Sequence, residues 1–194
     1  MTNNIPSKKT LIKIAQESYP TWHRADKQRW TNCTWEMLNY IKNWENIRLF
    51  VKKSFLRINS EKFEEEYKLI KSKFKNIVPN QWFVWVWNDV FAFCSPIEIK
   101  VDILWNRNKN YIINLLKQNK KLLKQLIFFI KCYEEFVNEW KVVDLQWDEN
   151  LVISDDNKLY YTDSFLVLSE HTKKKSLENL ELLKTLINEV EQIS

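Results

Sequence analysis

The clearest hydrophobic pattern lies in the second half of the chain, over residues 111–140. Apolar side chains recur there at steps of four and three residues, at Leu122, Leu126, Phe129, Tyr133, Phe136 and Trp140. This spacing is the period of one face of an α-helix, so it predicts a long amphipathic helix. A similar apolar stripe follows Ser176, a residue type that is typical of a helix N-cap, and predicts a final helix.

The front half contains shorter segments with helical spacing. Residues 7–18 predict a short helix that Pro20 interrupts, because a proline disfavours helical geometry in the residue before it. Residues 34–44 place several large apolar side chains on one helical face and predict a second helix. A third helix is expected to begin at Ser60, where glutamates enrich the first turns, and to end before Pro79.

Short apolar runs bounded by turn residues predict the strands. These runs lie at residues 47–51, 82–87, 90–94, 97–103, 151–153 and 159–161. Asn88-Asp89 separates two of them and predicts a hairpin with a two-residue turn. Ser154-Asp-Asp-Asn-Lys158 predicts a second hairpin, in which Asn or Asp must supply any left-handed turn because the chain has no glycine.

These elements predict an α+β fold with a small antiparallel sheet and a helical C-terminal part. Residues 1–95 form the expected N-terminal part, with helices, strands and a hairpin. Residues 96–110 are expected to be a connector. Residues 111–194 form the expected C-terminal part, with its hairpin at 144–165.

Composition narrows the class of protein. No apolar run approaches the ~20 residues that a membrane-spanning helix needs, and the N-terminus lacks the apolar core of a signal peptide. The three cysteines are widely spaced and match neither a disulfide framework nor a metal knuckle. We therefore expect a cytoplasmic protein without a membrane partner.

Positive charge is concentrated in the front half of the chain, and tryptophan is abundant. Residues 1–76 carry 16 Lys and Arg against 8 Asp and Glu, whereas residues 77–194 carry 14 against 17. The basic front half is compatible with a phosphate-bearing ligand, an acidic protein or nucleic acid, although scattered lysines also simply solvate a surface. Ten tryptophans are retained in the chain, which favours packing or contact roles for them.

The candidate chemistry lies in the segment Asp144-Leu-Gln-Trp-Asp-Glu-Asn150 and at Asp163. Asp144 and Asn150 bound a loop after the predicted long helix, and Asp163 follows the second strand of the predicted hairpin. This order resembles the catalytic core of the protein-kinase-like fold, which includes small kinases of the aminoglycoside-phosphotransferase type. The resemblance implies that Asp144 accepts the substrate proton, and that Asn150 and Asp163 bind Mg²⁺ on the phosphates of ATP.

The same resemblance extends to the front half. Lys52 follows an apolar strand and resembles the lysine that grips the nucleotide phosphates. Glu66 looks like its partner on the next helix, with Glu65 as the runner-up. Together these residues imply a minimal two-lobe kinase and a Mg-ATP-dependent phosphotransferase, with Asp148 as the substitute for Asp144 should the loop turn it away.

Several features differ from the family pattern. Asn150 stands six residues after Asp144 instead of five, and Val142-Val143 and Ser164-Phe165 replace the usual flanking residues. A chain without glycine has no glycine-rich phosphate loop. These differences favour the alternative of an inactive pseudokinase-like module that binds an acidic protein partner through its Trp-rich basic front half. Binding of nucleic acid through that half is a third, weaker interpretation.

Overall fold

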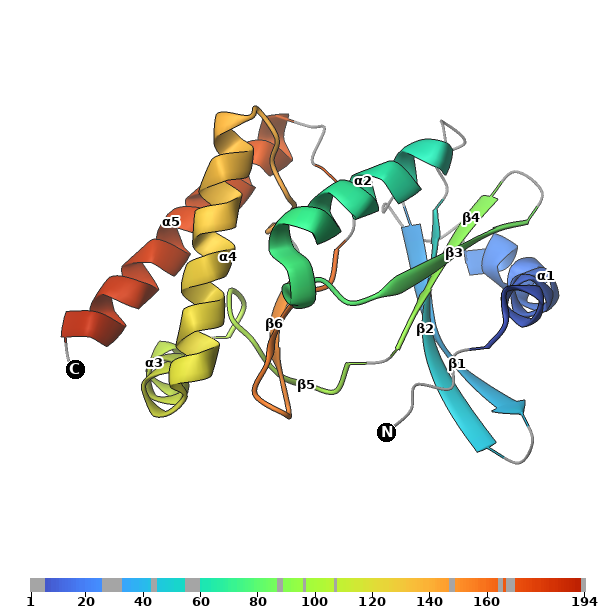
Figure 1. Cartoon of the computed structure of the whole chain (residues 1–194), viewed down its shortest axis with the longest axis horizontal. Coiled ribbons are helices and arrows are strands. Elements are labelled where there is room, and N and C mark those ends of the chain that lie inside the picture. The colour runs from blue at the N-terminus through green and yellow to red at the C-terminus, as the bar shows by residue number, and fades with distance from the viewer. Residues whose placement is uncertain are drawn as a thin grey trace. The chain divides into compact units, whose positions relative to one another are not determined.

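The chain has a mixed α+β fold (Figure 1). A computed structural model describes residues 6–25, 33–42, 45–54, 60–86, 89–95, 97–106, 108–146, 149–163, 166 and 170–192, and for residues 18–63 and 89 it describes only the backbone. Its helices are α1 (Lys8–Ala25), α2 (Ser60–Phe74), the 3-10 helix η1 (Lys75–Ile77), α3 (Lys109–Gln118), α4 (Lys120–Asn138) and α5 (Glu170–Gln192). Its strands are β1 (Cys33–Lys42), β2 (Glu45–Ser54), β3 (Gln81–Val86), β4 (Asp89–Cys94), β5 (Ile99–Asp102), β6 (Leu151–Ser154) and β7 (Leu159–Tyr161).

Two compact units make up the chain. The first comprises residues 1–64 and 80–96, and the second comprises residues 65–79 and 97–194. Each unit has its own antiparallel sheet, with strand order β1-β2-β4-β3 in the first and β5-β6-β7 in the second. Among the described residues, no helix is long and apolar enough to cross a membrane.

The first unit packs α1 against β3 and β4. Leu11, Ile14 and Ala15 of α1 form a buried cluster with four apolar side chains of the two strands, Val84, Val86, Phe91 and Phe93. Ser7 caps the helix, because its hydroxyl accepts a hydrogen bond from the Thr10 amide at 3.2 Å. The helix continues through Pro20 to Ala25, so the expected interruption there is wrong; a proline removes one backbone hydrogen bond without necessarily ending a helix.

The expected helix over residues 34–44 is also wrong. Residues 33–42 form β1, which pairs with β2 along its whole length, from Cys33 opposite Ser54 to Lys42 opposite Glu45. The apolar positions of this segment fit an alternating period as well as a helical one. The adjacent strand then decides the outcome, because it supplies ten residues of backbone partners.

The expected strands of the second half are confirmed. β6 and β7 pair as an antiparallel hairpin, with Leu151 opposite Tyr161 and Ile153 opposite Leu159. The hairpin packs beside α4, since the Leu159 amide donates to Gln125 Oε1 at 3.2 Å and the ring centroids of Phe129 and Tyr161 lie 5.9 Å apart. β5 pairs with the other edge of β6 and completes the sheet.

The expected single helix over residues 111–140 is instead two helices. Asn119 leaves the helical conformation, with φ −126° and ψ 87°, and divides α3 from α4. Its side chain accepts from the Leu122 amide at 3.0 Å and thereby caps α4. Its own N–H points back to the carbonyl oxygens of Leu115 and Leu116. One asparagine therefore ends one helix and begins the next, a role that the apolar spacing does not reveal.

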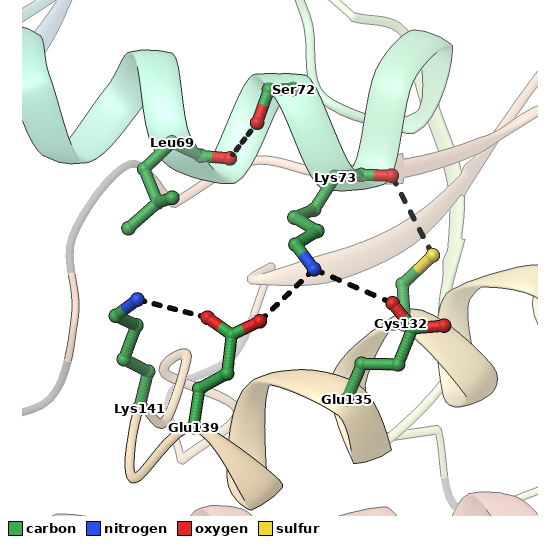
Figure 2. Close-up of polar contacts among 7 residues, drawn as sticks. All are labelled: Leu69, Ser72, Lys73, Cys132, Glu135, Glu139 and Lys141. Atoms are coloured by element: carbon green, nitrogen blue, oxygen red, sulfur yellow. Dashed lines mark hydrogen bonds and ion pairs between the residues drawn. The ribbon is translucent and has the colours of Figure 1, made fainter.

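Polar contacts fix the C-terminal turn of α2 on α4 (Figure 2). Lys73 Nζ lies 3.1 Å from Glu139 Oε1 and 3.5 Å from Glu135 Oε2, and the Cys132 thiol donates to the Lys73 carbonyl at 3.5 Å. Hydrogen bonds from Lys141 and Lys73 hold the pKa of Glu139 below its ordinary value. Exposed ion pairs add little stability, so we infer that these contacts mainly orient α2 and the residues it carries.

Trp140 ends α4 in a conformation that suits glycine. Its φ is 60° and its side chain is 93% exposed. The Lys141 amide donates to the Phe136 carbonyl at 2.9 Å and the Trp140 amide to the Val137 carbonyl at 3.0 Å, the pattern of a Schellman cap. In this chain a tryptophan occupies the left-handed position of that cap.

We therefore expect Trp140→Gly to raise stability above that of Trp140→Ala by about 1 kcal/mol. Both substitutions remove the exposed ring, but only glycine adopts the left-handed conformation without strain from a Cβ atom. Paired thermal melts of the two variants measure the difference. Equal melting temperatures would show that the backbone at residue 140 is not strained.

Candidate functional site

The loop between Asp144 and Asn150 is closed by its own polar groups. Asp144 Oδ1 accepts a hydrogen bond from the Gln146 amide at 2.8 Å, and Asn150 Nδ2 donates to the Asp144 carbonyl at 3.0 Å. The first contact forms a tight turn at the start of the loop. The second joins the two candidate residues directly, even though one more residue separates them than in the family pattern.

The contact to Asp144 also sets the orientation of the Asn150 amide. Its nitrogen donates to the Asp144 carbonyl, so the amide oxygen is the acceptor atom of this side chain. An amide oxygen is a hard donor of the kind that Mg²⁺ accepts. The local hydrogen bonding therefore presents Asn150 as a possible oxygen ligand.

Asp163 lies at the same end of the hairpin as Asn150. Leu151 and Tyr161 are the last pair of the β6–β7 ladder, and the Thr162 amide donates to the Asn150 carbonyl at 2.9 Å. Asp163 is therefore one residue beyond the hydrogen bond that holds Asn150. The sequence placed both residues at strand ends, and the register of the strands brings those ends together.

Tyr161 contacts the backbone at the start of the loop. Its hydroxyl oxygen accepts from the Asp144 amide at 3.0 Å, and its side chain is fully buried. Burial raises the pKa of Tyr161 well above its ordinary value, and the negative charges of Asp163 and then Asp144 raise it further. The backbone of Asp144 is therefore bonded to Tyr161, two residues before Asp163, so that both acids belong to one neighbourhood.

Glu66 borders this neighbourhood from α2. Glu66 Oε2 accepts from the Leu166 amide at 3.3 Å, and Leu166 forms an isolated antiparallel bridge with Val143. The bridge aligns the segment after Asp163 with the segment before Asp144. Glu65, the runner-up, is exposed, whereas Glu66 is half-buried.

Lys52 belongs to the first unit. It lies on β2, an inner strand of the four-stranded sheet, opposite Trp35 of β1 and Ala92 of β4. The structure describes the backbone of Lys52 but not its side chain. Asp148, Ser164 and Phe165 lie wholly outside the described residues. Glu66, Asp144, Asn150 and Asp163 all belong to the second unit, where a hydrogen bond joins Asn150 directly to Asp144.

The start of the loop is held by α5. The Leu145 amide donates to Ser176 Oγ at 3.0 Å, and Asn179 Nδ2 donates to the Leu145 carbonyl at 2.7 Å. Ser176 is fully buried inside α5, which begins at Glu170, so the expectation that Ser176 caps this helix is wrong. Its hydroxyl serves the loop instead, because a buried hydroxyl requires a partner.

Three residues that contact the loop have no distinctive sequence signal: Tyr161, Ser176 and Asn179. Tyr161 was assigned only to an apolar strand, and Ser176 and Asn179 only to a helix. The one available signal was the presence of polar positions three residues apart on a helix face, and that signal is common on ordinary surfaces.

Among the described residues, no three or more His, Cys, Asp or Glu side chains gather in a group that could hold a metal ion. Asn150 and Asp163 provide only an amide and one carboxylate. Mg²⁺ sites that rely on substrate phosphates and water use one or two carboxylates from the protein, so such a pair fits this kind of site and not a site built wholly from protein ligands.

No protein-family model matches this chain, and no curated protein shows significant similarity to it.

Proposed function

We propose that this chain is a divergent Mg-ATP-dependent phosphotransferase of kinase-like fold. The observation that carries the proposal is the tie between loop and hairpin, in which Asn150 joins Asp144 through its amide nitrogen and Thr162 through its carbonyl oxygen. These two hydrogen bonds gather an acid, an amide and a second acid at one end of a short hairpin. That combination suits a nucleotide phosphate site better than a structural turn, which needs no second acid.

The chemistry follows from the residue types. Asp163 and the amide oxygen of Asn150 would hold Mg²⁺, which neutralises charge on the phosphates of ATP. Asp144 would accept the proton of the substrate hydroxyl as its oxygen bonds to the γ-phosphorus. The bond between that phosphorus and the β–γ bridging oxygen breaks, and ADP leaves. The resemblance to kinases further assigns Lys52 to the phosphates, as a point charge.

The hydrogen bonds of Asp144 suit this role. One carboxylate oxygen, Oδ1, accepts from Gln146, and the backbone amide and carbonyl are tied to Tyr161 and Asn150. Backbone and side chain are therefore held in one geometry before any substrate binds. Preorganisation of this kind is the main contribution that a protein can make to phosphoryl transfer.

A second candidate function is a catalytically inactive relative that binds a protein partner. It is favoured by the complete absence of glycine, which rules out a glycine-rich phosphate loop. Such a module would use the Trp-rich basic front half to hold an acidic protein. In both cases we propose a cytoplasmic location, in keeping with three cysteines whose wide spacing matches no disulfide framework.

Binding of Mg-ATP tests the proposal directly. Saturating Mg-ATP at 100 times its dissociation constant is expected to stabilise the protein by about 2.7 kcal/mol, since ligand that binds only the folded state shifts unfolding by mass action. The shift should require the metal and disappear in Asp163→Ala. Thermal melts with ATP alone, Mg²⁺ alone and both together measure it.

Asp155→Ala is the matched control. Asp155 is an exposed aspartate in the turn at the other end of the same hairpin, so its loss removes an equal charge without touching the site. This variant should keep the full shift. Unchanged melting of the wild type across several nucleotides would count against nucleotide binding and favour the protein-binding alternative.

A further inference from the structure

Asp102 connects two segments through a single carboxylate. It is the last residue of β5, and its Oδ1 accepts from the amides of Leu104 at 2.9 Å and Trp105 at 3.0 Å. Its other oxygen, Oδ2, accepts from the amide of Glu149. Three backbone N–H groups thus converge on Asp102, two from the turn after β5 and one from the residue before Asn150.

The backbone at Glu149 needs such support. Glu149 has φ 62°, the left-handed region that glycine adopts without strain and that costs other residues about 1–2 kcal/mol. Its carbonyl accepts from the Thr162 hydroxyl at 2.6 Å, while its N–H is held by Asp102. Both backbone polar groups of Glu149 are therefore bound, and the bond to a carboxylate is the stronger kind.

We propose that Asp102 is a positioning residue that locks Glu149 in its left-handed conformation and so fixes Asn150 at the end of the hairpin. The direction of the chain at residue 149 determines where the next side chain points. Asp102 also belongs to β5, which pairs with β6 through Val152, so its carboxylate is carried on the same sheet that carries Asn150. The role of this lock in metal binding rests on the function proposed above. The hydrogen bonds that form the lock do not depend on that function.

Asp102→Asn separates the hydrogen bonds of the carboxylate to the turn after β5 from its hydrogen bond to Glu149. The amide oxygen can still accept from Leu104 and Trp105, where two donors meet one acceptor. The amide nitrogen then faces the Glu149 N–H, so that two donors oppose each other. The variant therefore keeps the turn after β5 and breaks only the link to the loop. Asp155→Asn is its control, because it removes one negative charge from an exposed position at the far end of the hairpin.

Amide hydrogen exchange on the metal-free 194-residue chain tests the lock. In Asp102→Asn the Glu149 amide should exchange about tenfold faster or more, because its charged acceptor is lost. The amides of β6 and α4 should keep their wild-type protection, which excludes general unfolding. Asp155→Asn should leave the Glu149 amide unchanged. Wild-type exchange at Glu149 in Asp102→Asn would overturn the lock.

The Mg²⁺ dependence of ATP binding tests whether the lock positions Asn150 for a metal ion. The Mg²⁺ concentration that gives half-maximal ATP binding should rise about tenfold in Asp102→Asn and stay unchanged in Asp155→Asn. Faster exchange at Glu149 with unchanged Mg²⁺ dependence would overturn the positioning role while leaving the proposed function intact. Failure of the wild type to bind ATP at any Mg²⁺ concentration would remove the proposed function, and exchange at Glu149 alone would then decide whether the lock exists.

Discussion

Phe74→Ala should lower the stability of the second unit by about 3–5 kcal/mol, the usual cost of removing a fully buried phenylalanine. Phe74 is inaccessible to solvent, and its ring centroid lies 4.9 Å from that of Phe129, 5.4 Å from that of Phe136 and 6.1 Å from that of Tyr161. Its loss leaves a cavity where α2, α4 and β7 meet. Thermal or urea unfolding measures the change, and we expect a drop in melting temperature of roughly 10 °C.

The same substitution should reach the candidate site. Tyr161 packs on Phe74 and accepts from the Asp144 amide, so a cavity beside its ring loosens the support of the loop. Tyr111→Ala provides the control, since it also removes an aromatic ring from a helix but at a position that is 40% exposed. Similar losses in the two variants would show that the cluster around Phe74 is not the core of this unit.

Asp144→Asn and Asp163→Asn should separate by role. Asp144→Asn is expected to keep nucleotide binding and to lose about 10²–10⁴-fold in turnover, because an amide does not accept the substrate proton. Asp163→Asn is expected to lose metal binding and with it nucleotide affinity, because it removes a charged oxygen ligand. Parallel measurement of ATP binding and of ATP hydrolysis or transfer distinguishes the two effects.

The comparison of the two variants also distinguishes the proposed function from its alternative. A wild type that binds nucleotide but turns over no faster than Asp144→Asn has no catalytic activity that depends on Asp144. The chain would then be a nucleotide-binding or purely structural protein. Loss of nucleotide binding in Asp144→Asn, with retention in Asp163→Asn, would reverse the assigned roles.

Local patterns predicted the short strands around turn residues well. The two expected hairpins and a strand within residues 97–103 form, because short apolar runs around turn residues leave few other ways to satisfy the backbone. The expected turn at Asn88-Asp89 is wrong in one residue, since Asp89 already belongs to β4 and pairs with Val86. The placement of Asn150 and Asp163 together followed from the β6–β7 hairpin alone. Both residues are close to it in sequence, so no distant contact was needed to bring them together.

The errors have equally physical causes. At residues 34–44 the apolar spacing fits two periods, and only the neighbouring strand β2 selects the extended one. At Asn119 a side-chain cap divides an otherwise continuous helical pattern. At Ser176 a residue type that is common at helix starts lies in mid-helix, because its hydroxyl is needed by the Leu145 amide. In each case a hydrogen-bond partner outside the local pattern decides the outcome.

The sequence by itself determined the mixed α+β class, the hairpin that carries Asn150 and Asp163, and the chemical types available at the site. The tertiary structure alone decided what holds them. Four residues reach the site region from other elements, and each accepts a hydrogen bond from a backbone amide there: Tyr161 of β7, Glu66 of α2, Ser176 of α5 and Asp102 of β5. Such a hydrogen bond needs only one acceptor at one position, so it produces no periodic pattern in the sequence. Only the packing of distant elements shows which acceptor binds which amide.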